Sequence, residues 1–187
     1  MSRHTPAIAA FVFFCLVGGH VVNEVSGEDL KQLTNNTNSV LKEFKGKLKF
    51  SCSSFYSSSW SVEKAFDGKP MTSWFTKGGD AAAHGKTPWI AVEFPMAVTV
   101  RRVTLLSNRE PSYPTGYTIL SGRLELLNKE GKVIFSQKDQ LSSKRQDMDF
   151  RIRMIIRGVY KIRFTSLKDE GDKNASRDVA LGEILIE

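Results

Sequence analysis

The sequence predicts an all-β fold, an antiparallel jelly roll or β-sandwich, on three observations. Short segments rich in Val, Ile and Phe alternate apolar and polar residues, which is the pattern of half-buried strands. Polar or Gly- and Pro-rich segments separate them, and no stretch between them has the apolar spacing of a helix. The predicted strands are residues 47–54, 88–94, 98–107, 122–127, 132–136, 149–156, 159–166 and 183–187.

One hairpin is predicted in detail. Gly122–Leu127 and Lys132–Ser136 flank the short loop Asn128-Lys129-Glu130-Gly131. Asn and Gly are typical of such loops, because Gly adopts the positive φ that the turn requires.

Length and composition limit the chain to one domain with a short leader or tail. The 187 residues are 41% hydrophobic and 25% charged, close to the globular average, which excludes disorder and a coiled coil. A net charge of +7 favours anionic surroundings but is too low for a dedicated nucleic-acid binder.

The N-terminus has the features of a secretory signal peptide. An apolar run of 11 residues, Ala7 to Val17, follows Arg3. It is shorter than the ~20 residues of a membrane-spanning helix but matches the apolar region of a signal. Small residues place cleavage after Gly19 or after Gly27, and an uncleaved anchor is the alternative.

The sequence divides the chain into three segments. Residues 1–27 form the signal, residues 28–46 a short lead-in with helical spacing, and residues 47–187 the β domain. We therefore expect a secreted or periplasmic/extracellular protein with no transmembrane span in the mature chain. Sequons at Asn35 and Asn174 are glycosylation sites only if the source is eukaryotic.

The mature chain offers little for catalysis. Without the leader it retains one cysteine, Cys52, and one histidine, His84, which excludes an internal disulfide and a zinc site. The sequence shows no nucleophile with a base, no phosphate loop and no paired carboxylates. We therefore expect a protein that is not an enzyme.

Residues 47–187 resemble the discoidin, or coagulation factor V/VIII type C, domain. The order and spacing of several short motifs carry the resemblance: Ala65-Phe66-Asp67-Gly68, Thr72-Ser73-Trp74, Pro88-Trp89-Ile90 and Gly182-Glu183-Ile184. The resemblance implies a galactose-binding-like jelly roll, in agreement with the predicted strands. Trp74 and Trp89 lie in strand contexts that indicate core positions.

The resemblance also implies a structural calcium site. In many bacterial members the Asp-Gly turn wraps the ion with oxygen ligands, which hard cations prefer. The corresponding ligands are the carbonyls of Lys64 and Lys69 and the side chains of Asp67, Thr72 and Glu183. The alternative is a plain turn, in which Gly68 supplies the unusual backbone angle.

Sugar-binding relatives place an Arg at the end of a central strand, with polar loop residues and an aromatic ring beside it. Arg109 matches that position, Asn108 and Tyr113 lie in the same loop, and Trp60 and His84 lie in other loops. The resemblance thus implies a carbohydrate site of these five residues.

One position departs from the family pattern. Phe75 stands directly after Thr72-Ser73-Trp74, where sugar-binding relatives often carry His. This departure weakens the case for recognition of galactose in the family manner.

Basic residues alternate with apolar ones near the C-terminus, over what we expect to be two neighbouring strands. They form either a solvated face or a site for an anionic polymer. These residues are Arg151, Arg153, Arg157, Lys161 and Arg163.

Together the sequence favours an exported, non-catalytic module that recognises carbohydrate or another cell-surface ligand through loops at one end of the jelly roll. The alternative is a structural or protein-interaction scaffold in an envelope or extracellular assembly, because fold does not decide function.

Overall fold

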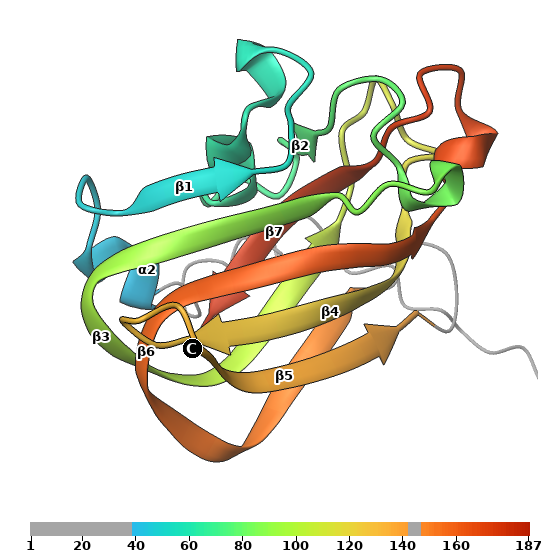
Figure 1. Ribbon diagram of the computed structural model, residues 1–187. Coiled ribbons are helices and arrows are strands. Elements are labelled where there is room, and N and C mark those ends of the chain that lie inside the picture. Colours follow the sequence, from blue (N-terminus) through green and yellow to red (C-terminus); the bar gives the residue numbers. More distant parts are fainter. Residues whose placement is uncertain (1–38, 142–146) are drawn as a thin grey trace, which may run out of the picture.

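The computed structural model describes residues 39–141 and 147–187, which form a two-layered antiparallel sandwich (Figure 1). The predicted jelly roll is confirmed. The elements are α2 (Ser39–Glu43), β1 (Lys49–Cys52), β2 (Trp74–Phe75), β3 (Trp89–Ser107), β4 (Ile119–Leu127), β5 (Val133–Gln140), β6 (Met148–Asp169) and β7 (Ala180–Ile186), with short 3-10 turns η1 (Ser58–Trp60), η2 (Val62–Ala65), η3 (Ala82–His84) and η4 (Gly171–Lys173).

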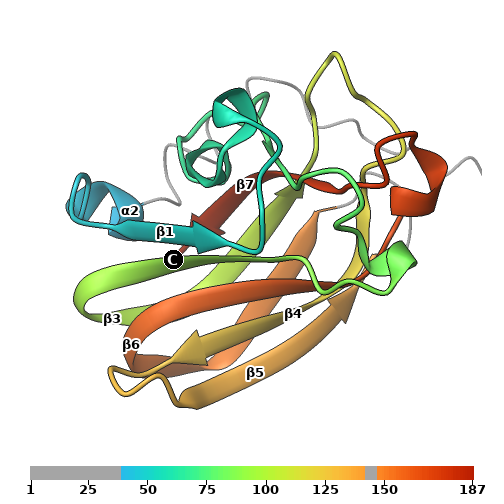
Figure 2. The same ribbon diagram turned by 45° about the horizontal axis from the view of Figure 1, so that its top comes forward.

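Two long strands, β3 and β6, pass through both layers. One layer holds β1, the first part of β3, the second part of β6, β4 and β5, and the other holds β2, β7, the second part of β3 and the first part of β6. The ladder of β3 and β6 changes register between Glu93 and Arg102, where the two strands bend together (Figure 2). Such irregularities let a strand bend from one sheet into the next.

This bend corrects the strand prediction at two places. Residues 88–94 and 98–107 form one strand, and residues 149–156 and 159–166 form another. Pro95 at the first break and Arg157-Gly158 at the second indicate loops, but both strands continue, and Gly158 adopts a positive φ of 74° within β6. The basic row therefore lies on a single bent strand and not on two neighbours.

The predicted hairpin of β4 and β5 is confirmed. Gly131 has a φ of 76°, and the side-chain oxygen of Asn128 accepts a hydrogen bond of 2.8 Å from the N–H of Lys132.

The core lies between the layers and includes the predicted Trp74, which is 1% exposed. Its Nε1 donates a hydrogen bond of 2.9 Å to the Ser54 carbonyl, so the buried indole N–H is satisfied. Trp89 is only half-buried, because it faces away from the core that its neighbour Ile90 enters; its predicted core position is wrong.

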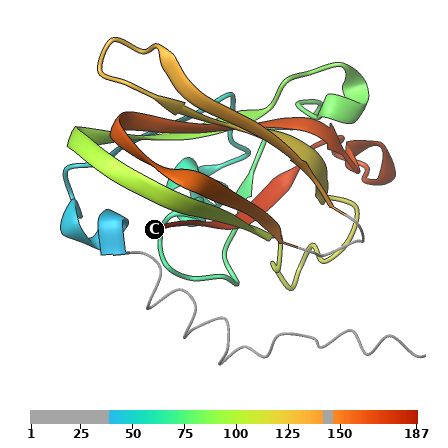
Figure 3. The ribbon, with the colours of Figure 1, turned by 90° about the horizontal axis from the view of Figure 1, so that it is seen from below.

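The described part of the lead-in, residues 39–46, closes the end of the core where β3 and β6 bend (Figure 3). Part of it forms α2, which supplies the buried Leu41. Phe44 packs edge-on against Phe94 of β3, with ring centres 6.3 Å apart. The predicted signal, residues 1–27, lies outside the described residues, and so do Asn35 and the rest of the lead-in before Ser39. Within the described parts of the chain, no helix has the length and apolarity needed to cross a bilayer.

Candidate functional site: an aromatic pocket

Aromatic side chains from separate parts of the chain meet in a pocket. Figure 1 shows the long loops gathered at one end of the sandwich, and most of the lining residues lie in these loops. The pocket encloses about 290 Å³ when the open space at its mouth is counted. It is lined by Tyr56, Trp60, Phe75, Tyr113, Tyr117, Ser176 and Asp178.

The rings pack edge to face around Phe75 and Tyr113. Tyr113 lies 5.5 Å from Trp60, 5.7 Å from Phe75 and 5.9 Å from Tyr117 between ring centres. Tyr56 joins through Trp60 at 5.6 Å. Phe75 is buried, whereas Tyr56 and Tyr113 are 55% and 38% exposed, so the cluster has an apolar base and an accessible rim. Edge-to-face contacts hold such rings in fixed orientations.

Buried polar contacts fix the loop that carries Tyr113. The side-chain amide of Asn108 donates to the Tyr113 carbonyl at 2.7 Å, and its oxygen accepts from the Ser73 hydroxyl at 2.8 Å. Asn108 is 8% exposed. Asn108 therefore holds the main chain of Tyr113 in place without lining the pocket itself.

A second clamp joins the loop of Tyr117 to that of Asp178. The side-chain amide of Asn174 donates to the carbonyls of Gly116, at 2.7 Å, and Asp178, at 2.9 Å. Gly116 has a φ of 84°, and a Cβ there would lie 3.1 Å from the Lys173 carbonyl, so the close approach requires glycine.

Asp178 is the acidic residue of the pocket. The residue is 2% exposed, and no group in the described part of the chain donates a hydrogen bond to its Oδ1. Burial raises the pKa of this carboxyl to about 6, against a smaller lowering by its own N–H. The preceding Arg177 adopts a left-handed φ of 57°, which is uncommon for a side chain other than Gly and Asn.

The five residues expected to bind sugar divide into two groups. Trp60 and Tyr113 line the pocket, whereas Asn108, Arg109 and His84 do not. The guanidinium of Arg109 makes two hydrogen bonds of 2.9 Å to the Asp147 carboxylate and one of 3.0 Å to the Ser107 carbonyl. His84 is exposed on η3.

Five pocket residues were not among those expected: Tyr56, Phe75, Tyr117, Ser176 and Asp178. Two signals in the sequence point to them. Tyr113 and Tyr117 lie four residues apart in a loop rich in Pro and Gly, and Phe75 stands at the family position that often carries His. Nothing local marks Asp178, because its role follows from burial that only the fold reveals.

Four of the five residues expected to bind calcium meet at one loop: Asp67, Lys69, Thr72 and Glu183. The Thr72 hydroxyl lies 3.0 Å from both Asp67 carboxylate oxygens and 2.8 Å from the Lys69 carbonyl. Glu183 is fully buried and reaches the same turn, where it accepts from the Gly68 N–H at 3.1 Å.

This donor set fits a hard cation. Within the described residues no group of three or more His, Cys, Asp and Glu gathers, so an ion here would rely on the hydroxyl and carbonyl oxygens as well. The Lys64 ammonium lies 4.0 Å from Asp67 and shields part of its charge. Gly68 has a φ of 75°, as the predicted turn requires.

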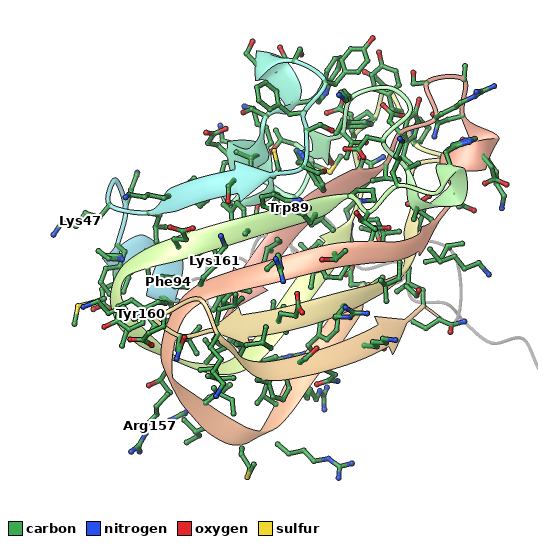
Figure 4. All side chains as sticks on the ribbon, in the orientation of Figure 1. Lys47, Trp89, Phe94, Arg157, Tyr160 and Lys161 are labelled. Carbon is green, nitrogen blue, oxygen red and sulfur yellow. The ribbon has the colours of Figure 1, made fainter. Side chains whose placement is uncertain are left out.

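Three of the five basic residues on β6 are neutralised by neighbours. Lys161 contacts Glu93 at 2.9 Å, Arg163 contacts Glu125 at 2.8 Å, and Arg151 contacts Asp149 at 2.7 Å. Arg153 and Arg157 are exposed (Figure 4 shows Arg157 pointing away from the sandwich). The continuous basic face that the alternation indicated is thus interrupted by one acid each from β3, β4 and β6 itself.

Comparison with known proteins supports the identification made from the motifs. Residues 49–125 match the family model of the F5/8 type C domain. No curated protein matches the chain.

Solved structures share the fold over most of the chain. The family 32 carbohydrate-binding module of Clostridium perfringens NanJ, in complex with galactose, has a TM-score of 0.60 at 16% identity and covers 74% of this chain and 92% of its own. An F5/8 type C domain from Bacteroides fragilis has a TM-score of 0.57 at 19% identity, covering 76% and 91%. A fucose-binding module of Streptococcus pneumoniae has a TM-score of 0.56 at 12% identity, covering 75% and 93%.

Proposed function

We propose that the F5/8 type C domain in this chain is an exported, non-catalytic module that binds carbohydrate in the aromatic pocket. The observation that carries the proposal is the pocket itself. It presents aromatic rings at an accessible rim, and its loops are clamped by Asn108 and Asn174. Aromatic faces pack against the apolar faces of sugar rings, and pre-ordered loops lower the entropic cost of binding.

The comparisons support the same ligand class. Similar folds include a module described with galactose and one described as fucose-binding. The altered set of pocket residues, with Phe75 in the place of His, argues for a different sugar.

The test is binding of the full chain to a glycan array, followed by titration of the glycans that bind. Tyr56→Ala should weaken binding about tenfold, because a stacked aromatic contributes on the order of 1 kcal/mol beyond its buried area. Phe55→Ala is the matched control: Phe55 is 50% exposed beside Tyr56 but does not line the pocket. An equal loss of glycan affinity in Tyr56→Ala and Phe55→Ala would contradict the proposed site.

The second candidate ligand, an anionic polymer on β6, is tested in the same experiment. Binding there would weaken steeply with salt and would fail in the double variant Arg153→Gln, Arg157→Gln while surviving Tyr56→Ala. A chain that binds no glycan of either class would favour the scaffold role.

We also propose that the loop of residues 64–72 holds a structural calcium ion together with Glu183. Asp67, Thr72, Glu183 and the carbonyls of Lys64 and Lys69 would supply the oxygen ligands. The ion would compensate the charge of the buried Glu183 and fix the loop that leads into Trp74 and Phe75.

A further inference from the structure

The pocket combines aromatic walls with a single buried carboxyl group. Tyr56, Trp60, Phe75, Tyr113 and Tyr117 supply the walls, and Asp178 is their only charged companion among the lining residues. No Lys, Arg or His lines the pocket, and within the described chain no ion pair involves Asp178. Arg177, its neighbour in sequence, is exposed and outside the lining.

An unpaired carboxylate at this depth is costly. Removing an ionised group from water is unfavourable unless a counter-charge or donors replace the water. Here the residue is 2% exposed, and its Oδ1 accepts no hydrogen bond from the described residues. The fold thus retains a negative charge without a partner beside a cavity, which is the arrangement that a positively charged ligand would complete.

The aromatic rings favour the same ligand charge. The faces of Trp and Tyr rings carry negative potential and attract cations within about 6 Å. An anionic ligand would meet these faces and Asp178 with no basic side chain to compensate. A neutral sugar would stack on the rings but would leave the negative charge of Asp178 without a counter-charge.

We propose that the pocket selects a protonated amine, carried by a hexosamine whose amino group is free, with Asp178 as the counter-ion. The inference rests on the proposed carbohydrate function and names the ligand class within it. The ammonium lies against Trp60 and the tyrosine rings and turns one N–H toward the Asp178 carboxylate, while the sugar ring stacks at the rim.

The test compares two ligands that differ only at the amino group, which is free in one and acetylated in the other. The full chain is titrated calorimetrically at pH 7 with a β-1,4-linked glucosamine oligomer and with the N-acetylglucosamine oligomer of equal length. N-acetylation removes the charge and keeps the ring, so we expect at least about tenfold weaker binding of the acetylated oligomer. Asp178→Asn should lower affinity for the amine form by a similar factor and so reduce the difference in affinity between the two oligomers.

The outcomes separate this inference from the proposed function. Equal binding of the two oligomers, or tighter binding of the acetylated one, would overturn the amine preference and leave carbohydrate binding intact. Binding of neither oligomer, nor of any other glycan, would overturn both. The comparison of the two ligands uses the unaltered chain, so it decides the question even if Asp178→Asn fails to fold.

A pH series on the unaltered chain adds an independent check. Tyr56, Tyr113 and Tyr117 are the other titratable groups of the lining, and burial raises the pKa of the Tyr117 hydroxyl further above its ordinary value. Affinity for the amine oligomer should therefore fall below about pH 6, as Asp178 becomes protonated. An amine affinity that is equal at pH 6 and at pH 4.5, two values at which the sugar amine is protonated, would contradict the role of Asp178.

Discussion

Asn174 binds both main-chain groups of Asp178: its side-chain amide donates to the Asp178 carbonyl at 2.9 Å, and its oxygen accepts from the Asp178 N–H at 3.3 Å. The same amide also donates to the Gly116 carbonyl at 2.7 Å. Asn174 therefore sets the position of the acidic residue relative to the loop that carries Tyr117. Asn174, which the sequence marks as a glycosylation sequon, thus links two loops of the pocket through hydrogen bonds to their main chains.

Replacing Asn174 should loosen the pocket and destabilise the domain. Asn174→Ala removes three hydrogen bonds and leaves part-buried main-chain groups without partners, at a cost of about 1–3 kcal/mol. Chemical denaturation measures this cost, and calorimetry should show weaker glycan binding. Asn128→Ala, which removes one exposed turn contact, is the control and should cost less. Equal costs would show that the clamp does not form.

Asn174 should remain unmodified in a eukaryotic secretory host. An attached glycan would be bonded to the side-chain nitrogen that donates to the carbonyls of Gly116 and Asp178. Because these contacts are part-buried, the fold leaves little room for a glycan on that nitrogen. Mass spectrometry of the secreted chain should find the peptide of residues 170–180 without glycan. A glycan found on Asn174 in a folded chain would show that the hydrogen bonds from Asn174 to the Gly116 and Asp178 carbonyls do not form.

Stability should depend on Asp178 in a defined pH range. Its pKa is raised from 3.8 to about 6 in the folded chain, so the folded state binds the proton more tightly than the unfolded one. The penalty of ionisation is fully present above about pH 6 and disappears as pH falls toward 4. Asp178→Asn should therefore stabilise the domain by about 1–3 kcal/mol at pH 8 and by little at pH 4.

Thermal unfolding of the two proteins at both pH values measures the difference. Asp67→Asn is the control, because Asp67 accepts hydrogen bonds from Lys69 and Thr72 and should lose stability when replaced. A stabilisation by Asp178→Asn that is equal at both pH values would show that relief of buried charge is not its cause.

The core position of Trp74 allows a direct test of the fold. The side chain is 1% exposed, and its N–H is bonded to Ser54. Trp74→Ala should destabilise the domain by about 3–5 kcal/mol, the range for aromatic cavities in cores. Trp89→Ala should cost much less, because Trp89 is only half-buried on the outer face. A denaturant midpoint unchanged in Trp74→Ala would place the ring outside the core.

The sequence predicted the fold better than the site, for physical reasons. Strand patterning and the order of short motifs report local alternation and turns, so Trp74, Gly68 and the β4–β5 hairpin were placed correctly. The bends of β3 and β6 look like breaks in the sequence because Pro95-Met96-Ala97 and Arg157-Gly158 interrupt the alternation where the strands change layers.

The site depends on contacts between loops far apart in the sequence. Tyr56 and Asp178 line one pocket although 122 positions separate their numbers, and no local pattern marks such a pair. Arg109 matched a family position, yet Asp147 pairs with its guanidinium at 2.9 Å. A motif match places a residue on an element, but the neighbours of its charged group come from the rest of the fold.

Calcium should stabilise the folded chain. An ion that binds only the folded chain stabilises it by mass action, by about 2.7 kcal/mol at a concentration one hundred times its Kd. Calcium should therefore raise the melting temperature relative to chelator, and magnesium should do so less, because it demands a smaller, near-octahedral site. Asp67→Asn should abolish the calcium response.

Glu125→Gln is the matched control, since Glu125 is a buried carboxylate that pairs with Arg163 on β6, outside the calcium loop. This variant should lose stability while keeping the full response to calcium. Equal melting temperatures in calcium and in chelator for the unaltered chain would leave the Asp67 turn as a plain turn, held by the hydrogen bonds from Thr72 and from the Lys69 N–H.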